Sequence, residues 1–506
     1  MTNILEYLEN DVMKCPEKTA FIDPERSITY AVLQKNSKSI GTGLAKIFAP
    51  CSAAPVFMEK SAASMEVFMG IVSAGCFYVQ LDVRQPKDRL ASILETLHAD
   101  TIITSEKEIE SLKELGIARN ILVYEELKAE ECDEKLLADI RNYALDIDPL
   151  YGIFTSGSTG VPKGVVVNHR SVIDFITVFS KTFGFDESDI IGNQAPFDFD
   201  VSVKDIYTSL AVGATMVIIP TQYFSLPKVL LDYISDKHVT SLTWAVSAVC
   251  LVSQLHGLEY KIPADVRRVM FSGEVMPIRH LNAWREALPN ALYVNLYGPT
   301  EITCNCTYYI VDREFEAGDV LPIGIPFKNE RVFLLDDKNC LVTEEDVEGE
   351  ICVSGTAVTI GYYNNPEQTA KAFTQNPLNK KYPEIIYRTG DLGKYNENGE
   401  LVFISRKDFQ IKHMGHRIEL GEIDAALEKI PEITRSCTLF INNKLVLYYS
   451  GEIERAALSD RLKTFLPQYM IPNVFRKKDI LPVTKNAKID RKALTNEYLE
   501  EKKKRR

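Results

Sequence analysis

The sequence predicts an α/β protein with a large N-terminal domain of layered α/β subdomains and a small α+β domain at the C-terminal end. Three observations support this fold class. At 506 residues the chain is too long for one ordinary hydrophobic core. Through most of its length, β-rich apolar runs alternate with amphipathic helical segments, which is typical of largely parallel sheets. From about residue 349 the pattern becomes strand-rich.

In the large domain, strands and helices are expected to alternate along the chain. AAPVFME (53–59) and CFYVQLD (76–82) are predicted strands, and SAASMEVFMGIVSAG (61–75) is the helix between them. DTIITS (100–105), NILVYE (120–125) and ATMVIIP (214–220) are further strands of this kind. Parallel sheets with helical crossovers are therefore expected.

The C-terminal region has a different texture. GEICVSG (349–355), the stretch 401–420 and KLVLYYSGE (444–452) are strand-rich, and RAALSDRLKTFL (455–466) is helical. Charged residues interrupt a β-run near Arg406 to Asp408. We therefore expect a large domain over residues 1–407 and a small domain over residues 408–506.

Composition limits the function classes. Hydrophobic and charged contents of 45% and 25% are those of a soluble globular protein. The net charge of −12 argues against a broad nucleic-acid or anionic-membrane surface, because both require a cationic field. We expect a cytoplasmic enzyme with no nucleic-acid partner and no membrane insertion, since neither a membrane-spanning window nor a signal pattern is evident. The ten cysteines are scattered without a C-x-x-C pair, so reduced, buried thiols are expected.

Residues 151–167, YGIFTSGSTGVPKGVVV, predict a strand–loop–strand phosphate site. Apolar residues precede Thr155 and a β-branched run follows Gly164, as expected of two strands. Hydroxyl side chains and glycines between them offer donors and backbone amides to an anion. The Walker pattern does not fit, because Gly164 follows Lys163 where that motif has serine or threonine. From this stretch alone, a surface hairpin loop explains the residues equally well.

Four further motifs follow this loop in a fixed order. They are NLYGPTE (295–301), YRTGDLG (387–393), SRKDFQIKHMGHRIELGEID (405–424) and LPVTKNAKIDRKAL (481–494). With the loop, they resemble the acyl-adenylate-forming superfamily, which includes acyl-CoA synthetases, firefly luciferase and the adenylation domains of nonribosomal peptide synthetases. The resemblance covers essentially the whole chain. It implies that family's fold, with a mobile C-terminal domain, and a two-step reaction: a carboxylate attacks the α-phosphorus of ATP, pyrophosphate leaves, and a thiol then takes the acyl group.

The resemblance implies how the triphosphate is held. Thr155, Ser156 and Thr159 would contact the β- and γ-phosphates of ATP, with Lys163 nearby. Thr300 would reach the α-phosphate. Hydroxyl and cationic donors are the groups that such a polyanion requires.

The same resemblance implies the nucleoside and metal contacts. Tyr297 would stack on adenine, and Asn295 would hydrogen-bond its exocyclic amine. Asp391 would accept both ribose hydroxyls and Arg406 would add a ribose contact. Glu301 would hold Mg²⁺, which with ATP is the expected cofactor set. The remaining nucleotide-binding positions implied are Gly157, Gly273, Glu274, Leu296, Gly298, Pro299 and Phe403.

The C-terminal motifs imply the catalytic lysine and a hinge. Lys488 would bridge the ribose-side oxygen and the substrate carboxylate, and would neutralise two anions that must approach each other. Asp408 would be the hinge about which the small domain rotates between the two half-reactions. Two departures from the family pattern stand out: Ala487 replaces the usual glycine, and Gln80 replaces the usual proline.

The stretch FDFDVSVKDIY (197–207) resembles the segment that binds the substrate ammonium in amino-acid-activating members. Asp200 takes the place of their aspartate. A carboxylate in a substrate pocket needs a partner, and an α-ammonium is a suitable one. The competing interpretation is a structural aspartate that starts the following helix. By motif, the other pocket residues are Val201, Lys204, Thr243, Met270, Ser272, Leu296, Cys304 and Asn305.

The identity of the amino acid stays open at this level. The overall pattern resembles free-standing D-alanine–D-alanyl carrier protein ligases, but these have an apolar residue at the position of Lys204. Lysine there indicates an acidic substrate side chain, and Ser272 and Asn305 make the pocket more polar than alanine requires. Alternatively, Lys204 lies four residues after Asp200 and pairs with it along a helix. D-alanine and a polar or acidic amino acid are therefore both retained.

Three function classes follow. The first is an ATP-dependent amino-acid ligase whose acceptor is a separate phosphopantetheinylated carrier protein, since no carrier domain follows Lys492. The second is an acyl-CoA synthetase for a non-amino carboxylate, which Asp200 disfavours. The third is a catalytically silent nucleotide-binding scaffold, which the joint presence of Glu301, Asp391 and Lys488 disfavours.

Overall fold

A computed structural model describes residues 1–157, 161–316, 318–408, 410–483 and 489–504. The chain divides into two compact units. The first unit comprises Met1–Val83, Thr96–Ile153 and Gly164–Lys407. The second comprises Arg84–Glu95, Phe154–Lys163 and Asp408–Arg506. Two short stretches from early in the sequence thus belong with the C-terminal unit, an arrangement that the sequence pattern did not indicate.

A nine-stranded sheet dominates the first unit. Its central strands are parallel. At one edge β2 is antiparallel to β1, and at the other edge β14 and β15 form antiparallel pairs. Runs such as TMVI and RVMFS are mainly apolar and are buried at every residue, as expected of parallel strands that are covered on both faces. In spatial order the strands are β15 (Ile325–Pro326), β14 (Thr307–Ile310), β13 (Leu292–Tyr297), β12 (Arg268–Ser272), β11 (Ser241–Ala245), β9 (Ile190–Asn193), β10 (Thr215–Ile218), β1 (Thr19–Ile22) and β2 (Ser27–Thr29).

Two further sheets complete this part of the fold. A seven-stranded sheet has the order β19 (Gly361–Tyr362), β8 (Lys163–Asn168), β7 (Pro149–Thr155), β4 (Phe77–Leu81), β3 (Ala53–Phe57), β5 (Thr101–Thr104) and β6 (Asn120–Val123). An antiparallel sheet has the order β17 (Leu341–Val342), β16 (Glu330–Leu335), β18 (Gly349–Gly355), β21 (Ile385–Tyr395) and β20 (Phe373–Gln375), with β22 (Leu401–Arg406) also paired to β21. Strands β7 and β8 confirm the predicted strand–loop–strand element.

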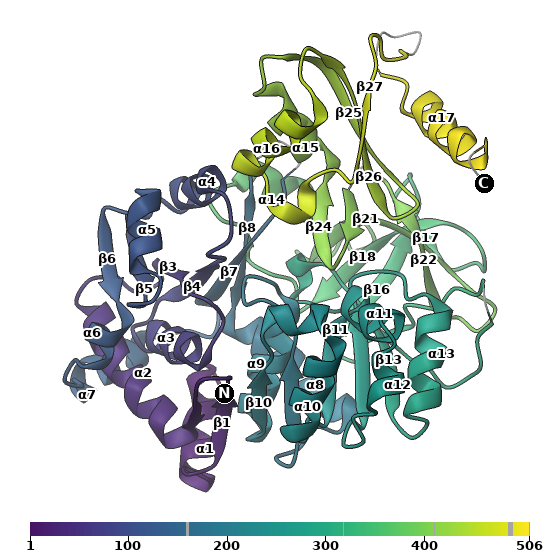
Figure 1. Cartoon of the computed structure of the whole chain (residues 1–506). Coiled ribbons are helices and arrows are strands. Elements are labelled where there is room, and N and C mark those ends of the chain that lie inside the picture. The colour runs from purple at the N-terminus through teal and green to yellow at the C-terminus, as the bar shows by residue number, and fades with distance from the viewer. Residues whose placement is uncertain (158–160, 317, 409, 484–488, 505–506) are drawn as a thin grey trace. The chain divides into compact units, whose positions relative to one another are not determined.

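Helices link and cover these sheets. Those outside the second unit's C-terminal segment are α1 (Leu5–Lys14), α2 (Tyr30–Ala45), α3 (Ala62–Ser73), α4 (Lys87–Leu97), α5 (Ile109–Leu115), α6 (Tyr124–Lys128), α7 (Glu134–Tyr143), α8 (His169–Phe183), α9 (Val201–Val212), η1 (Thr221–Ser225), α10 (Pro227–Asp236), α11 (Val246–Gln254), α12 (Gly257–Tyr260), α13 (Ile278–Ala287), η2 (Thr300–Ile302) and α14 (Pro366–Ala372). Figure 1 shows α10 to α13 gathered beside β11 and β13.

Helices α8 and α9 share one hydrophobic core with both parallel sheets. Tyr78 of β4, Ile206 of α9 and Met270 of β12 all belong to this core. Helix α9 is apolar or buried along nearly its whole length, and it ends at Gly213, whose φ of 66° is left-handed. Glycine at this position ends the helix without the steric cost that another residue would carry. The large buried helix therefore brings its polar residues into the interior.

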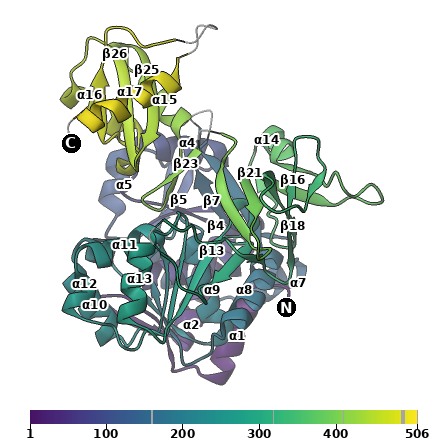
Figure 2. The same cartoon turned by 90° about the vertical axis from the view of Figure 1, so that its right-hand side faces the viewer.

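The second unit contains a small sheet and its helices. A three-stranded sheet has the order β25 (Ile433–Ile441), β26 (Lys444–Gly451) and β27 (Val474–Lys477), and a separate hairpin pairs β23 (Gln410–His413) with β24 (His416–Glu419). The helices are α15 (Leu420–Glu428), α16 (Arg455–Phe465), η3 (Gln468–Met470) and α17 (Arg491–Lys504). Figure 2 shows α15 and α16 beside β25 and β26.

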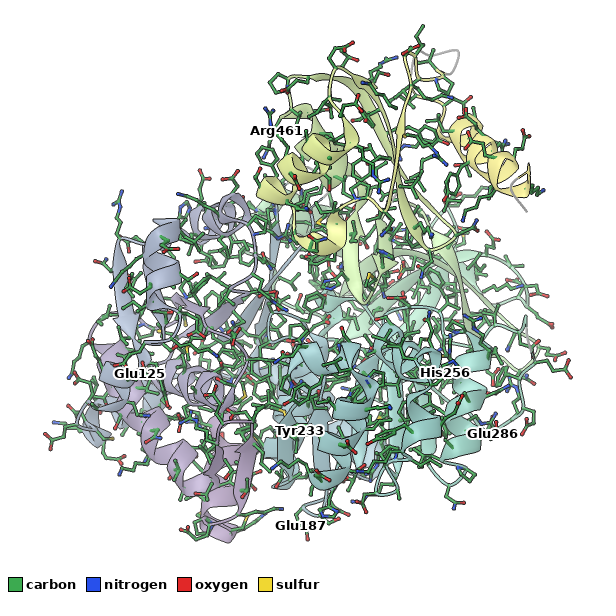
Figure 3. The ribbon with its side chains drawn as sticks, in the orientation of Figure 1. Glu125, Glu187, Tyr233, His256, Glu286 and Arg461 are labelled. Atoms are coloured by element: carbon green, nitrogen blue, oxygen red, sulfur yellow. The ribbon has the colours of Figure 1, made fainter. Side chains whose placement is uncertain are left out.

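The structure confirms the predicted mixed α/β class. The expected strand at 349–355 is present with the same bounds. The expected strands at 53–59, 76–82 and 100–105 and the expected helices at 61–75 and 455–466 are present with shorter bounds. Side chains fill the layers between sheets and helices, while labelled charged residues such as Glu125 and Arg461 lie at the periphery of their own units (Figure 3). Among the described residues, no helix is both long enough and apolar enough to span a membrane.

Candidate functional site

Predicted site residues gather where three parallel strands of the nine-stranded sheet end. Register places Thr243 of β11 beside Met270 of β12, and Ser272 of β12 beside Leu296 of β13. Side chains alternate along a strand, so these four share the face that packs toward α9. The carboxyl ends of parallel strands form the usual ligand-binding edge of such a sheet.

The segment after β13 turns sharply before it reaches two buried polar residues. A Cβ on Gly298 would lie 2.5 Å from the Cα of Asn305, so only glycine fits this close approach. Thr303 and Cys304 both have positive φ, of 52° and 88°. Such backbone strain in non-glycine residues is often found at functional sites. The strain here places Cys304 and Asn305 in the interior, where both are at most 2% exposed.

Asp391 joins three predicted nucleotide contacts into one cluster. Its Oδ2 accepts from the Tyr297 hydroxyl at 2.5 Å, and its Oδ1 accepts from Arg406 Nη1 at 2.5 Å. Strand pairing places Asp391 directly opposite Arg406. Burial, and then the neighbouring Asp391, raise the pKa of Tyr297, so this phenol stays a neutral donor. The arrangement holds one buried carboxylate in a fixed orientation between an aromatic ring and a guanidinium.

Other predicted nucleotide residues lie on or directly after β12, β13 and β22, or in η2. Asn295 is buried, and its side-chain nitrogen donates to the Pro322 carbonyl at 2.8 Å. Thr300 begins η2 and is buried, and Pro299 precedes it. Phe403 lies on β22 opposite Gly393. Gly273, with φ of 98°, and Glu274 follow directly after β12.

Glu301, the predicted metal ligand, is fully buried in η2. Its Oε1 accepts from the Tyr362 hydroxyl at 2.8 Å. A carboxylate is the kind of ligand that Mg²⁺ prefers, and one protein carboxylate suffices where phosphates supply other oxygens. Among described residues, no group of three or more His, Cys, Asp or Glu could hold a metal by itself. Tyr362 was missed from sequence, because 61 residues separate it from Glu301.

Lys204, Cys304, Asn305 and Tyr151 are all buried, and we call them the Lys204 cluster. Lys204 is 1% exposed, and its Nζ donates to Asn305 Oδ1 at 2.7 Å. Cys304 Sγ lies 3.6 Å from the same oxygen. Burial raises the pKa of the Cys304 thiol to about 12, so the thiol is neutral.

Asp200 stands directly before α9 but does not cap it. It occupies the N-cap position with helical φ and ψ, and its side chain makes no cap hydrogen bond. This weakens the interpretation of Asp200 as a structural helix start. Within the part of the chain that the structure describes, Lys204 forms no ion pair with Asp200, so the pairing along the helix is not observed. Val201 is the first residue of α9 and is half-buried.

The predicted phosphate loop belongs to the second unit. Ser156 Oγ donates to the Arg417 carbonyl at 2.8 Å and accepts from the Glu419 amide at 3.2 Å. Thr155 Oγ1 is buried with no hydrogen-bond partner. Gly157 is required by packing, because a Cβ there would lie 1.9 Å from the Val161 carbonyl oxygen. Lys163 begins β8, and Thr159 lies outside the described residues.

The structure describes the predicted hinge but not the predicted catalytic lysine. Lys488 and Ala487 lie outside the described residues. Asp408 begins the C-terminal segment of the second unit, and its Oδ1 accepts from the Gln410 amide at 3.1 Å. The histidines at 413 and 416 end and begin the two strands of a hairpin, where His416 stacks on Tyr469 with ring centroids 3.6 Å apart.

Gln80 takes the place where the resemblance implies proline. Its side-chain nitrogen donates to the carbonyls of Met58 and Leu81, at 2.7 and 3.0 Å. The side chain thus bonds two neighbouring backbone groups in the seven-stranded sheet. The departure from the family pattern has a local structural explanation.

Comparison with known proteins identifies relatives along the whole chain. The model of the AMP-binding enzyme family matches residues 8–363. Zwittermicin A synthase ZmaJ of Bacillus cereus is 32% identical over 97% of this chain and 94% of its own length. Tyrocidine synthase 1 of Brevibacillus parabrevis is 30% identical over 97% of this chain, which spans only 45% of that protein. In fold, the Vibrio cholerae adenylation domain AlmE, solved with glycyl-adenosine-5'-phosphate, gives a TM-score of 0.84 at 22% identity over 98% of each chain.

Proposed function

Because the chain belongs to the AMP-binding enzyme family, we propose that it uses ATP to convert an amino acid to an aminoacyl-adenylate with release of pyrophosphate. It then transfers the aminoacyl group to the phosphopantetheine thiol of a carrier protein. One observation carries the choice of an amino acid. Asp200 is a carboxylate that caps no helix and lies by the buried Lys204 cluster. An α-ammonium would neutralise it there.

The Asp391 cluster is proposed to hold the nucleoside. A carboxylate has about four acceptor positions, and Tyr297 and Arg406 use two of them. The other two would accept the two ribose hydroxyls. Tyr297 would stack on adenine, and Asn295, whose nitrogen is engaged with Pro322, would offer Oδ1 to the exocyclic amine.

The triphosphate would lie along Thr300 and the loop that contains Thr155, Ser156, Thr159 and Lys163. The unpartnered Thr155 hydroxyl is available as a donor. Glu301 would hold Mg²⁺, which when bound neutralises charge on the phosphates. Held in this way, the triphosphate would present its α-phosphorus to the substrate carboxylate in line with the departing pyrophosphate.

Lys488 is proposed as the catalytic residue of adenylate formation. Its ammonium would contact both the substrate carboxylate and the ribose-side oxygen, which stabilises the negative charge that develops between them. For the second step, residues 408–506 would move as a domain about Asp408. The backbone contacts of Arg417 and Glu419 with Ser156 support a role for β24 near the phosphate loop in one of these states.

The proposal also specifies the acceptor and the amino-acid substrate. A separate carrier protein remains the acceptor that we propose, and the substrate is D-alanine or a polar or acidic amino acid. The remaining alternative is an acyl-CoA synthetase for a non-amino carboxylate. That enzyme would have no use for a carboxylate at position 200.

Amino-acid-dependent exchange of pyrophosphate into ATP tests the proposal. We expect exchange with at least one common L- or D-amino acid and none with fatty or aryl acids. Exchange with fatty or aryl acids alone would establish the acyl-CoA synthetase. An absence of exchange with every acid, from a protein that still binds ATP, would identify a nucleotide-binding scaffold.

A further inference from the structure

Residues 356–363, which we call the clasp segment, hold Glu301 at two points. The Thr359 amide donates to the backbone carbonyl of Glu301 at 3.1 Å, and the Tyr362 hydroxyl donates to Glu301 Oε1 at 2.8 Å. The first contact fixes the backbone of the glutamate, and the second fixes its carboxylate. One short segment therefore determines both where Glu301 lies and how its side chain is turned.

The first half of the clasp segment is anchored to buried residues. Thr303 directly follows η2, the turn that carries Glu301, and its Oγ1 donates to the Ala357 carbonyl at 2.7 Å. The Ala357 amide donates in turn to Glu330 Oε1 at 3.1 Å. Thr303 and Glu330 are both buried. Because Ala357 is held through both of its peptide groups, the segment cannot shift independently of the turn that contains Glu301.

The second half of the clasp segment is bonded to the strand that follows the predicted phosphate loop. The Ile360 amide donates to the Val166 carbonyl at 3.0 Å, and the Tyr363 amide donates to the Gly164 carbonyl at 2.7 Å. Between these two bonds, β19 pairs antiparallel with β8. Strand β8 begins at Lys163, where that loop ends. Glu301 is therefore tied, through the clasp segment, to the strand that leaves the phosphate loop.

The ring of Tyr362 is fixed by its own packing. Tyr362 is 8% exposed, and its ring meets that of Phe373 edge to face, with centroids 5.7 Å apart. Its amide donates to Thr369 Oγ1 at 3.0 Å. An aromatic side chain held in this way presents its hydroxyl at one position. Glu301 is fully buried, and a carboxylate in the interior requires hydrogen-bond donors in defined places.

We propose that Tyr362 is a positioning residue of the metal site, whose hydroxyl turns the Glu301 carboxylate into the orientation that binds Mg²⁺. This inference rests on the proposed function, with Glu301 as the Mg²⁺ ligand. A carboxylate is planar, so a fixed Oε1 also fixes the direction of the second oxygen. The hydrogen-bond partners of ligating side chains typically change metal affinity by about 10- to 100-fold when they are removed. The sequence motifs did not include Tyr362.

The test measures metal-dependent binding of ATP rather than catalysis. Isothermal titration calorimetry without an amino acid gives the Kd for ATP with saturating Mg²⁺ and with EDTA, and we call the ratio of the two the metal enhancement. Tyr362→Phe keeps the ring in the core and removes only the donor. We expect it to lower the metal enhancement by about 10-fold or more and to change the Kd in EDTA by less than about 2-fold. KM for the amino acid in pyrophosphate exchange should stay unchanged.

Tyr124→Phe is the matched control. The Tyr124 hydroxyl donates to Glu66, another glutamate that is fully buried in the first unit, so the substitution makes the same chemical change at a second tyrosine–glutamate contact. Both variants are expected to lower the melting temperature, because each removes a hydrogen bond to a buried carboxylate. Only Tyr362→Phe is expected to change the metal enhancement. An equal loss in both variants would show a general effect of destabilisation and would overturn the inference.

A double variant tests whether Tyr362 acts through Glu301. Glu301→Gln removes the ligating charge and should itself lower the metal enhancement. If the tyrosine acts only by orienting this side chain, Tyr362→Phe should cause no further loss in the Glu301→Gln background. Additive losses in the double variant would show that Tyr362 affects the metal independently of Glu301, and would overturn the positioning role.

The failure of this inference is distinct from the failure of the proposed function. A wild-type metal enhancement in Tyr362→Phe, together with a loss in Glu301→Gln, would overturn the role of Tyr362 and keep Glu301 as the ligand. A wild-type metal enhancement in both variants would overturn the metal assignment of Glu301 as well. Amino-acid activation would stand in either case as long as amino-acid-dependent pyrophosphate exchange is observed.

Discussion

The Asp391 cluster allows the nucleotide contact to be tested with a nearly isosteric change. Asp391→Asn keeps the shape of the side chain but replaces one carboxylate oxygen with an amide nitrogen. In the structure, one oxygen accepts from Tyr297 and the other from Arg406, each at 2.5 Å. The amide has one oxygen with two acceptor positions, so it cannot serve both protein donors and two ribose hydroxyls.

The expected loss follows from this count. A hydrogen bond to a charged group contributes about 1.5–3 kcal/mol, and these contributions are not fully additive. A loss of about 2–4 kcal/mol corresponds to a rise of roughly 30- to 700-fold in the Kd for ATP. Isothermal titration calorimetry with ATP and with AMP measures this change. KM for the amino acid should change much less.

A second buried carboxylate provides the control. Asp189 is fully buried in the same unit, and its Oδ1 accepts from Arg268 at 2.6 Å and from Arg267 at 3.0 Å. Asp189→Asn makes the same chemical change in another arginine-bound carboxylate, so it should lower thermal stability without weakening ATP binding. Wild-type affinity for ATP in Asp391→Asn, or an equal loss in both variants, would refute the ribose assignment.

Four further perturbations have defined outcomes. Lys488→Ala should lower pyrophosphate exchange by at least about 100-fold while the melting temperature is retained, and near-normal exchange would remove Lys488 from the mechanism. Asp200→Ala should raise KM for the amino acid by about 10- to 100-fold and KM for ATP little, whereas equal effects would make Asp200 structural. Glu301→Gln should raise the Mg²⁺ concentration required for half-maximal exchange, and an unchanged requirement would exclude Glu301 as a ligand. Burial lowers the pKa of His169 to about 3, so below pH 6.5 the unfolded chain binds a proton that the folded chain does not. The free energy of unfolding, measured with urea, should therefore fall by about 2 kcal/mol more between pH 7 and pH 5 in the wild type than in His169→Asn. Parallel pH profiles of the two proteins would contradict this.

The fold was predictable from sequence because its strands are strongly patterned. Residues 53–59 and 76–82 are apolar runs that are bounded by polar residues, and they form β3 and β4. Each such run can be assigned as a strand from its own residues, because its apolar side chains are buried. The attachment of residues 84–95 and 154–163 to the second unit depends on long-range contacts, such as that between Ser156 and Arg417, and these have no local pattern.

The candidate site was predictable to the extent that motifs carry it. Asp391, Tyr297 and Arg406 come from three different motifs, and the structure brings them into direct contact. The partner of Lys204 was not predictable in this way. Helical spacing favoured Asp200, but a strained turn at Thr303 and Cys304 brings Asn305 to the lysine instead.

Residues outside the motifs escaped prediction for a related reason. The bond from Tyr362 to Glu301 and the unpartnered hydroxyl of Tyr151 are properties of packing between distant segments. A tyrosine in an apolar strand is ordinarily a core residue, so the composition of the strand gives no sign that the hydroxyl has a polar role. Such a tyrosine is distinguished from other core tyrosines only by whether its hydroxyl has a hydrogen-bond partner in the structure.

Amino-acid activation is the central claim, and pyrophosphate exchange with matched acids tests it most directly. Each amino acid is paired with the same acid lacking the α-amino group, for example glutamate with glutarate and alanine with propionate. The account predicts exchange with an amino acid and at least about 100-fold less with its deaminated counterpart, because the latter has no α-ammonium to pair with the Asp200 carboxylate. Equal exchange with both members of the pair would contradict it.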